Sequence, residues 1–514
     1  MQYRNPIIPG FNPDPSICRD GKDYYLVTSS FEFFPGVPIY HSRNLVNWEL
    51  LGHCLDRPSQ LPLNGCPASK GIYAPTIRFH EGVFYMTTTN TTGGGNFIVH
   101  TKDIRGPWSD PVYIEQKGID PSLLFLDGKI YFCSNAGMEG DPKGIYVCEI
   151  DPLTGERRSS SICISHGSGG KAVEAPHLYF INGWYFLILA EGGTEYGHMV
   201  TMQRSRDLYG PYENCPHNPI LTHRNRWRHP IQATGHADLF EDTQGNWWMV
   251  CLGIRPLPLG SLMLHNLGRE TFLAPVRWEA GWPIVGNNGL IELEMEGPLP
   301  EPPRPESHDF TDDFTGEKLS PHWNYVRNPV PSRYCLKDGR LLLDGSGETL
   351  SGMNPTFIGI RQPSFIMKAE TTVSAEPAAG TRAGICAYYN DSYHYEICLE
   401  RSDEGLHVLV NKRIHDMEAI SFKQPIPKLK GDVELRIQAD IGWYYFSYRL
   451  PGGEWQDCGG GMTAGLCTEG THTMTFTGVY IGLFSTGGRA GFGGFALNGT
   501  DEEEHGLHGK EHGL

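Results

Sequence analysis

Hydrophobic positions in the first 300 residues fall into short runs, and turn residues separate these runs. One pattern occurs five times: a polar or small residue, then Pro (Ala in the last copy), an apolar run, a turn with Gly, and an aromatic-rich run. A Gly turn between two such runs predicts a β-hairpin. A helical period is almost absent here. The copies are anchored, at spacings of 60, 46, 55 and 61 residues, by Pro15, Pro75, Pro121, Pro176 and Ala237.

A second motif follows three of these hairpins and predicts an outer pair of strands, at residues 42–52, 101–111 and 205–215. Repeats of about 50 residues with about four strands each are typical of a β-propeller. We therefore expect five units between residues 10 and 295, and a five-bladed propeller that forms a catalytic domain over residues 1–298.

The pattern changes beyond the propeller. Residues 299–312 are rich in Pro and acidic residues, which predicts a semi-rigid linker. Short alternating runs with closely spaced turns then continue to residue 500 and predict a β-sandwich over 313–500. Residues 501–514 are expected to be a polar tail. The predicted fold class is therefore all-β, a propeller followed by a sandwich.

Composition and charge exclude several classes of protein. The chain has 514 residues and a net charge of −17, which argues against nucleic acid as a partner. No apolar run approaches the roughly 18–20 residues of a membrane span. The start of the chain does not resemble a signal peptide, and the 13 Cys lack CxxC spacing. We expect a cytoplasmic protein with reduced cysteines and no membrane partner.

Polar residues begin the first strands of several units. Asp14, Asp120 and His236 occupy equivalent positions in units one, three and five, and Glu174 precedes that position by one residue in unit four. The innermost strands of a propeller line its channel, so these side chains should meet at one end. One such Asp could simply cap a turn, but clustered carboxylates repel one another and folding does not require them.

Two facing carboxylates, one protonated and one ionised, suit the cleavage of a glycosidic bond. A third carboxylate nearby raises the pKa of the acid. Aromatic residues near the same mouth could stack on a sugar or could only pack the rim: Phe31, Phe33, Phe34 and Tyr73. The basic and aromatic run at 223–229 is expected to be a rim loop around this pocket.

The stretches "NPIIPGFNPDPSI", "GIDPSLLFLDGKIYF", "VEAPHLYFINGWYFLILAEGGT", "TGHADLFED" and "LGRETFLAPVRWEAGWP" together resemble glycoside hydrolase family 43. The resemblance is closest to its two-domain β-xylosidase and α-L-arabinofuranosidase branch. It implies a five-bladed propeller, a concanavalin-like sandwich and an inverting mechanism.

The resemblance also implies roles for individual residues. Asp14 would be the general base, Glu174 the general acid, and Asp120 would tune the pKa of Glu174 and orient it. Arg269 and His236 would contact substrate or organise the pocket floor. Further pocket residues would be Phe31, Tyr73 (where the family often has Trp) and, from the stretch "AGFGGF", Phe492.

No cofactor is expected to be required, although some family members hold a calcium ion in the channel near the histidine that matches His236. We expect no protein-bound metal from the sequence itself, an oligosaccharide as the substrate, and leave a homo-oligomer open.

The leading expectation is an exo-acting, inverting β-xylosidase that releases terminal xylose from β-1,4-xylooligosaccharides. The alternative is an α-L-arabinofuranosidase, or an enzyme with both activities, on arabinose-decorated oligosaccharides. An internally cleaving arabinanase, a retaining fructosidase and a sugar-binding propeller without catalysis are weaker alternatives. The fructosidases have an Asn-Asp-Pro-Asn-like motif, from which "NPDPS" departs.

Overall fold

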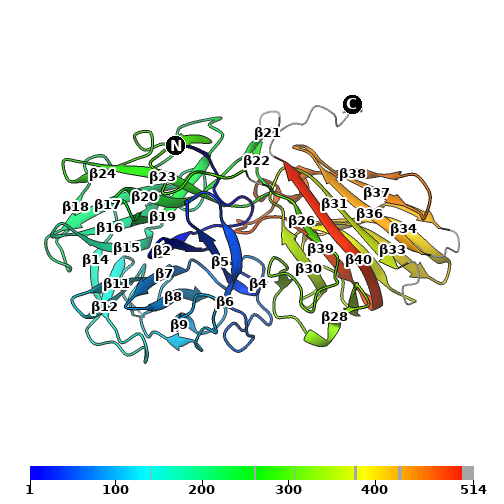
Figure 1. The fold of residues 1–514 in the computed structure, drawn as a ribbon, viewed down its shortest axis with the longest axis horizontal. Helices are drawn as coiled ribbons and strands as arrows, with labels where there is room; N and C mark the ends of the chain where they lie inside the picture. Colours follow the sequence, from blue (N-terminus) through cyan, green and yellow to red (C-terminus); the bar gives the residue numbers. More distant parts are fainter. Residues whose placement is uncertain (139, 260–261, 306, 375–378, 427–430, 501–514) are drawn as a thin grey trace.

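The computed structural model describes residues 1–138, 140–259, 262–305, 307–374, 379–426 and 431–500. The predicted tail at 501–514 lies outside this range. The described chain forms two lobes, one from the first 300 residues and one from the remainder (Figure 1). Both are built from strands, and the helical elements of the described residues are short 3-10 turns. No helix in these ranges is long and apolar enough to cross a membrane.

Within the described residues, the first lobe contains five four-stranded antiparallel sheets. Each sheet begins with one of the predicted hairpins. The first and second sheets contain β2 (Ser16–Asp20), β3 (Asp23–Val27), β5 (Gly36–Ser42) and β6 (Glu49–Leu55), then β7 (Thr76–His80), β8 (Val83–Asn90), β9 (Gly95–Thr101) and β10 (Val112–Tyr113). The third contains β11 (Ser122–Leu126), β12 (Lys129–Ser134), β13 (Ile145–Glu149) and β14 (Ile162–Ser165). The fourth and fifth contain β15 (Glu174–Ile181), β16 (Trp184–Glu191), β17 (Met199–Ser205) and β18 (Glu213–Asn214), then β19 (Gln232–Glu241), β20 (Trp247–Ile254), β23 (Glu270–Glu279) and β24 (Trp282–Val285).

The start of the chain joins the first sheet to the last. β1 (Gln2–Arg4) pairs with β25 (Glu294–Glu296), and Ile8 forms a bridge with Thr271 of the fifth sheet. The innermost strands of these two sheets are linked by a buried hydrogen bond, in which Ser16 Oγ donates to Asp238 Oδ2 at 2.7 Å. The ring of sheets is thereby closed, and the starts of the innermost strands meet at one end.

The second lobe is a sandwich of two antiparallel sheets around a large apolar core. One sheet contains β26 (Phe310–Asp312), β28 (Tyr334–Lys337), β29 (Arg340–Ser346), β31 (Ile366–Ser374), β36 (Asp432–Ala439), β37 (Trp443–Arg449), β38 (Gln456–Met462) and β40 (Gly487–Thr500). The other contains β30 (Thr356–Arg361), β32 (Arg382–Asn390), β33 (Tyr393–Ser402), β34 (Gly405–Ile414), β35 (Met417–Pro425) and β39 (Tyr480–Ser485). The predicted all-β class, a propeller followed by a sandwich, is confirmed.

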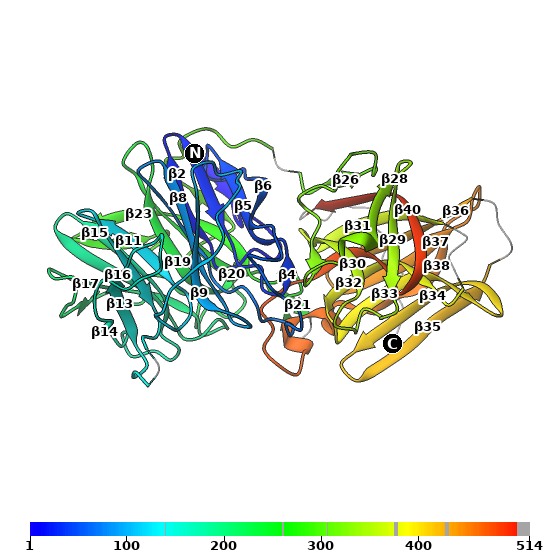
Figure 2. The same ribbon diagram turned by 90° about the horizontal axis from the view of Figure 1, so that it is seen from below.

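The two lobes share backbone pairing and a hydrophobic cluster. β4 (Phe33–Phe34) of the first lobe pairs with β27 (Tyr325–Val326) of the second. The ring of Phe33 stacks on Tyr480 with centroids 4.0 Å apart. The segment 463–479, with the 3-10 turns η2 (Thr463–Leu466) and η3 (Thr468–Gly470), lies between the lobes in orange in Figure 2. This segment brings residues of the sandwich to the mouth of the propeller.

Candidate active site

A pocket of about 390 Å³ opens where the innermost strands of the propeller begin. It brings together seven of the eight predicted site residues: Asp14, Phe31, Tyr73, Asp120, Glu174, His236 and Arg269. The remaining wall includes residues that sequence reasoning did not single out, namely Ala74, Ile119, Ala172, Gly193, Thr194, Glu195, Met474 and Phe476.

A shared backbone conformation aims the polar side chains at this pocket. Asp14, Asp120, Ala175 and His236 have φ angles of 56°, 54°, 52° and 46°. Left-handed φ is uncommon outside Gly, and such residues cluster at functional sites. In the fourth sheet Ala175 takes the turn position. Glu174 precedes it, next to a register shift before His177. Such bulges re-aim side chains.

Asp14 is held as a carboxylate. Arg269 Nη1 donates to its Oδ1 at 3.0 Å, and Ser29 Oγ donates to its Oδ2 at 2.5 Å. His236 Nδ1 lies 3.4 Å from Oδ1. Burial alone would raise the pKa of Asp14, but the charges of Arg269 and His236 and the Ser29 hydrogen bond outweigh it and lower the pKa. Asp14 is therefore ionised at neutral pH, as a proton acceptor must be.

Glu174 and Asp120 have the opposite electrostatic character. Burial, and then the nearby charge of Asp14, raise the pKa of Glu174 to about 7. Burial, and then the charges of Glu174 and Asp14, raise the pKa of Asp120 well above its usual range. Asp120 Oδ2 also accepts a hydrogen bond from the Ala175 backbone N at 3.2 Å, beside Glu174. Because these two interacting groups titrate together, the pair retains a proton near neutral pH.

Arg269 links Asp14 to two other walls of the pocket. Its Nη1 also donates to Thr194 Oγ1 at 3.0 Å, and its Nη2 donates to the Phe476 carbonyl at 3.3 Å. The guanidinium lies over the rings of Phe31 and Phe476, at 5.6 and 5.4 Å from their centroids. The paired and stacked guanidinium therefore holds the segments of Asp14, Thr194 and Phe476 in one arrangement.

Three aromatic rings form one wall of the pocket. Phe31 lies 5.3 Å from Tyr73 and 5.7 Å from Phe476, and Tyr73 lies 6.1 Å from Phe476. Phe31 is buried, whereas Tyr73 and Phe476 are partly exposed. Such faces can stack on the apolar side of a sugar ring.

The expectation that Phe492 enters the pocket is wrong. Phe492 lies inside β40, opposite Leu341 of β29, and is fully buried in the sandwich core. Its ring faces that core because side chains alternate along a strand and this position faces inward. The sandwich residues that line the pocket are Met474 and Phe476.

Most of the missed residues belong to loops, whereas Ala74 begins the second repeat. The Phe476 backbone N donates to Ser69 Oγ at 3.0 Å, which fixes this segment against the propeller. An isolated Phe in the polar stretch "THTMTFTG" was a signal for a functional loop. For Thr194, the signal was the adjacent glycines Gly192 and Gly193, whose φ angles are 93° and 76°.

The channel beneath the pocket does not match a calcium site. Arg78 donates to both oxygens of Asp238, from Nη1 at 2.8 Å and from Nη2 at 3.0 Å. Tyr179 Oη donates to the same carboxylate at 2.7 Å, and Arg78 Nη2 lies 2.9 Å from His177 Nδ1. Calcium takes six to eight oxygen ligands, but here a guanidinium already neutralises the carboxylate beside His236. No group of three or more His, Cys, Asp or Glu in the described ranges is placed to hold a metal ion.

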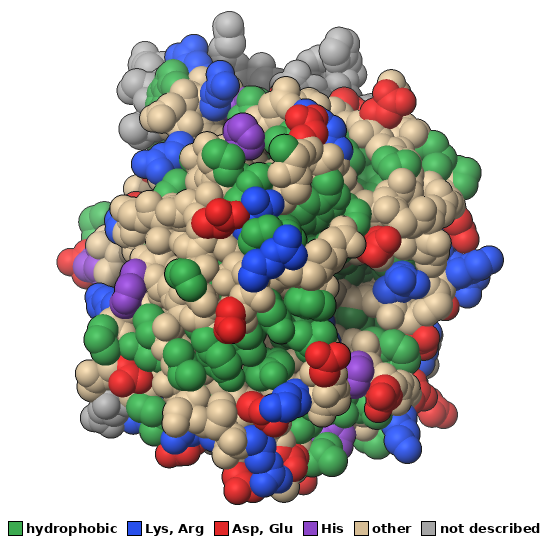
Figure 3. Space-filling view, turned by 90° about the vertical axis from the view of Figure 1, so that its left-hand side faces the viewer, with side chains coloured by type: hydrophobic (Ala, Val, Ile, Leu, Met, Phe, Trp, Pro, Cys, Tyr) green, Lys and Arg blue, Asp and Glu red, His purple; other side chains and the backbone are tan. Residues whose placement is uncertain are grey.

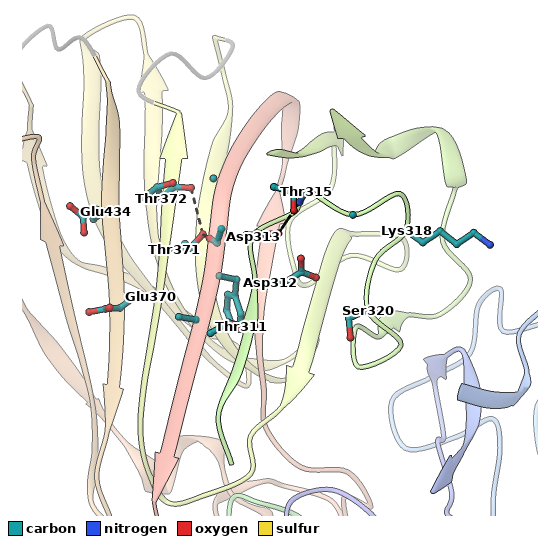
Figure 4. Close-up of a pocket in the computed structure, with 15 residues that line it drawn as sticks. Thr311, Asp312, Asp313, Thr315, Lys318, Ser320, Glu370, Thr371, Thr372 and Glu434 are labelled. Carbon is teal, nitrogen blue, oxygen red and sulfur yellow. Dashed lines mark hydrogen bonds between the residues drawn. The ribbon is translucent and has the colours of Figure 1, made fainter. Parts of the chain in front are cut away.

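A larger, open pocket of about 730 Å³ lies on the sandwich, between β40 and the start of that domain (Figure 4). Its carboxylates already have partners. Asp312 accepts from Trp323 Nε1 at 2.8 Å, and Glu370 accepts from Arg436 Nε at 2.6 Å. The propeller pocket, with its perturbed carboxylates, is therefore the candidate active site.

Comparison with known proteins agrees with this architecture. The family profile "Glycosyl hydrolases family 43" matches residues 3–283, and "Beta xylosidase C-terminal Concanavalin A-like domain" matches residues 311–496. The chain is 41% identical over 502 residues to "Non-reducing end alpha-L-arabinofuranosidase BoGH43B" of Bacteroides ovatus, covering 94% of this chain and 91% of that protein. It is 42% identical over 457 residues to "Xylosidase/arabinosidase" of Butyrivibrio fibrisolvens, covering 85% and 86%.

A solved structure shares the whole two-domain fold. The structure titled "Bacteroides ovatus Xyloglucan PUL GH43B" matches with a TM-score of 0.91 at 40% identity, over 97% of this chain and 100% of that one. The protein is thus a hydrolase of glycosidic bonds. The chain belongs to glycoside hydrolase family 43, with a concanavalin-like C-terminal domain, and the predicted family is confirmed.

Proposed function

We propose that the protein is an exo-acting, inverting glycosidase that releases terminal xylose from β-1,4-xylooligosaccharides. The observation that carries this proposal is the opposite electrostatic character of two carboxyl groups in one pocket. Asp14 has a lowered pKa, and Glu174 has a pKa raised to about 7. An ionised carboxylate beside a protonated acid is what cleavage of a glycosidic bond requires, and the configuration of the first product tests the inverting mode.

In the proposed reaction, the carboxylate of Asp14 removes a proton from a water molecule. The water oxygen forms a bond to the anomeric carbon on the face opposite the leaving group. The bond from that carbon to the glycosidic oxygen breaks, and the carboxylic acid of Glu174 gives its proton to that oxygen. Asp120 orients Glu174 through the Ala175 backbone. Arg269 holds Asp14 in place.

The exo mode is supported by how the pocket is bounded. Met474 and Phe476 come from the sandwich and form part of a wall that the propeller alone would lack. A pocket bounded in this way accepts one end of a chain, whereas an internally cleaving enzyme needs a cleft open at both sides. The relative named a non-reducing end enzyme supports this mode.

A second candidate is α-L-arabinofuranosidase activity, alone or beside xylosidase activity. It is supported by the two relatives, one named an arabinofuranosidase and the other a xylosidase/arabinosidase. Xylose and arabinose carry the same hydroxyl groups, so pocket shape decides between them.

Two measurements test the proposal. Initial rates on p-nitrophenyl β-D-xyloside and p-nitrophenyl α-L-arabinofuranoside, measured side by side, should give the higher kcat/KM for the xyloside. The reverse order would favour the second candidate. Proton NMR of the sugar first released from a β-xyloside should show α-xylose, and β-xylose as the first product would contradict the inverting mechanism.

A further inference from the structure

Residues 224–228 form an exposed basic and aromatic loop that the proposed reaction does not use. All five residues are exposed, and Trp227 retains 68% of its accessible surface. Three of the five are arginines, in a chain whose net charge is −17. On the propeller face shown in Figure 3, by contrast, acidic and basic side chains are interspersed. We call residues 224–228 the arginine loop.

The arginine loop is anchored from beneath by buried polar groups. Gln232 Nε2 donates to the Arg226 carbonyl at 2.7 Å and to the His229 carbonyl at 3.1 Å. Asn225 and Arg228 have φ angles of 67° and 64°. For a residue such as Arg the left-handed region is unfavourable, and strain of this kind persists where the surrounding structure enforces it, often at ligand-binding segments. The loop is therefore held in one shape while its side chains point to solvent.

The arginine loop lies beside the active-site pocket. Thr222 Oγ1 donates to the His198 carbonyl at 2.8 Å, at the end of the loop whose residues Thr194 and Glu195 line the pocket. Arg224 Nη1 donates to Met199 Sδ at 3.1 Å, at the start of β17. The loop directly precedes β19, which carries His236. It is therefore on the end of the propeller where the pocket opens.

Two of the arginines are available for a ligand. Within the described part of the chain, no carboxylate pairs with Arg226 or Arg228. A guanidinium binds a carboxylate in a bidentate manner, and an exposed indole ring stacks on the apolar face of a sugar. We propose that the arginine loop is a subsite for an acidic oligosaccharide, with a uronic-acid carboxylate on Arg226 and Arg228 and a sugar ring on Trp227.

This inference rests on the proposed exo-glycosidase function, because a pocket for one terminal pentose leaves the rest of the substrate outside it. A polyanion such as nucleic acid is a different ligand. It needs an extended basic surface, and this protein has a strongly negative net charge. A single carboxylate beside neutral sugars matches the small size of the loop.

The test compares xylotriose with xylotriose that carries one glucuronic acid on its reducing-end residue. Two exposed charge pairs, each contributing under 1 kcal/mol, correspond to about tenfold. The Arg226→Gln/Arg228→Gln variant should therefore lower kcat/KM about tenfold on the acidic substrate and less than twofold on the neutral one. Trp227→Ala should lower both. Activity on p-nitrophenyl β-D-xyloside, which does not reach the loop, should stay at the wild-type level in both variants.

The matched control is Arg105→Gln/Arg206→Gln. It removes two exposed arginines that follow β9 and β17, at the other end of the blades. It should leave kcat/KM unchanged on both the acidic and the neutral trisaccharide. Equal losses on both trisaccharides in the double variant of the loop would overturn the proposal. The proposal would also be overturned if the double variant kept the wild-type kcat/KM on both trisaccharides. Binding of a labelled oligonucleotide would then indicate a nucleic-acid ligand. If the wild type cleaved no pentoside, the proposed function would fail, and titration calorimetry of the acidic trisaccharide against wild type and loop variant would still decide the subsite.

Discussion

At the scale of single residues, the site depends on three neighbouring carboxyl groups whose pKa values are shifted in different directions. Asp14 and Asp120 are buried and Glu174 is partly buried, and burial by itself raises a carboxyl pKa. The pKa of Asp14 is nevertheless lowered, because Arg269, His236 and Ser29 all face its carboxylate. The charge of Asp14 then acts on Glu174 and Asp120 and raises their pKa values further. In the proposed mechanism, the groups that face Asp14 therefore decide which carboxyl group is the base and which is the acid.

Replacement of Asp14 by Asn should remove activity and leave the fold intact. Asn adopts left-handed φ more readily than most residues, so the turn at φ 56° is preserved. It cannot accept the proton of the attacking water, and loss of such a base costs about 10²- to 10⁴-fold in rate. Turnover of p-nitrophenyl β-D-xyloside and the melting temperature measure the two effects. Activity within threefold of wild type would rule out Asp14 as the base.

The pH dependence of the wild type should report the acid. As the proposed proton donor, Glu174 must be protonated to act, and its surroundings raise its pKa to about 7. The value of kcat/KM should therefore fall as pH rises through about 7. In Glu174→Gln this alkaline limb should disappear, and the loss of rate should be larger on xylobiose than on an aryl glycoside with a good leaving group. Equal losses on both substrates would show that Glu174 is not the proton donor.

The same substitution should stabilise the protein at alkaline pH. The pKa of Glu174 rises from 4.5 to about 7 on folding, so the folded state holds a proton that the unfolded chain releases. The free energy of unfolding therefore decreases as pH rises between these values. At pH 8 Glu174→Gln should be more stable than wild type by up to about 3 kcal/mol, and at pH 4 the difference should vanish. Urea unfolding at both pH values measures this, and an equal difference at the two would contradict it.

At the scale of elements, what the sequence could predict depended on repetition. The five hairpins share a pattern, so equivalence between repeats was enough to place Asp14, Asp120 and His236 at one end of the propeller. The channel pairing of Arg78 with Asp238 could not be found in this way, because it joins residues 160 positions apart.

The sandwich residues that line the pocket could not be predicted from the sequence either. Phe492 and Phe476 both stand in Gly- or Thr-rich stretches, and only the pairing of β40 with β29 decides that Phe492 faces the core. Phe476 precedes β39, in a segment whose path depends on contacts with the other lobe. Local pattern contains no information on such contacts.

One carboxylate also helps to fix the segment that carries Phe476. Glu469 Oε1 accepts from Tyr196 Oη at 3.0 Å and lies 2.7 Å from His265 Nδ1, and Oε2 accepts from the His265 backbone N at 3.0 Å. Burial opposes ionisation, but the charge and hydrogen bonds of His265 outweigh it and lower the pKa of Glu469. Tyr196 belongs to the loop of Thr194, so this group ties two pocket walls together.

Glu469→Gln should therefore weaken substrate binding more than catalysis. Loss of about 1 kcal/mol from a charged hydrogen bond corresponds to about fivefold in KM, with kcat within twofold. The control is Glu400→Gln, which disrupts a pair with Arg382 and Lys423 at the surface of the sandwich domain. Steady-state kinetics on xylobiose provide the readout. Identical KM values in the two variants would mean that Glu469 does not position the pocket wall.

At the scale of the whole molecule, the two domains form one functional unit because their shared hydrophobic cluster continues into the pocket. Phe11, Phe31 and Phe33 of the propeller pack with Phe357 and Tyr480 of the sandwich. Phe31 belongs both to this interface and to the wall of the active site. Burial of several aromatic rings in one cluster makes separate motion of the domains costly.

Phe33→Ala tests whether this interface supports catalysis. Phe33 is fully buried, stacks on Tyr480 and does not line the pocket. Truncation of a buried Phe costs about 3–5 kcal/mol, and here the cost falls on the domain interface beside Phe31. We expect calorimetric unfolding to separate into two transitions and kcat/KM to fall at temperatures where both domains remain folded. Phe446→Ala, in the sandwich core away from the interface, is the matched control. It should lower the stability of the sandwich by a similar amount and leave kcat/KM unchanged. If both variants retained the wild-type kcat/KM, the interface would contribute to stability alone, and the sandwich would act on the substrate only through Met474 and Phe476.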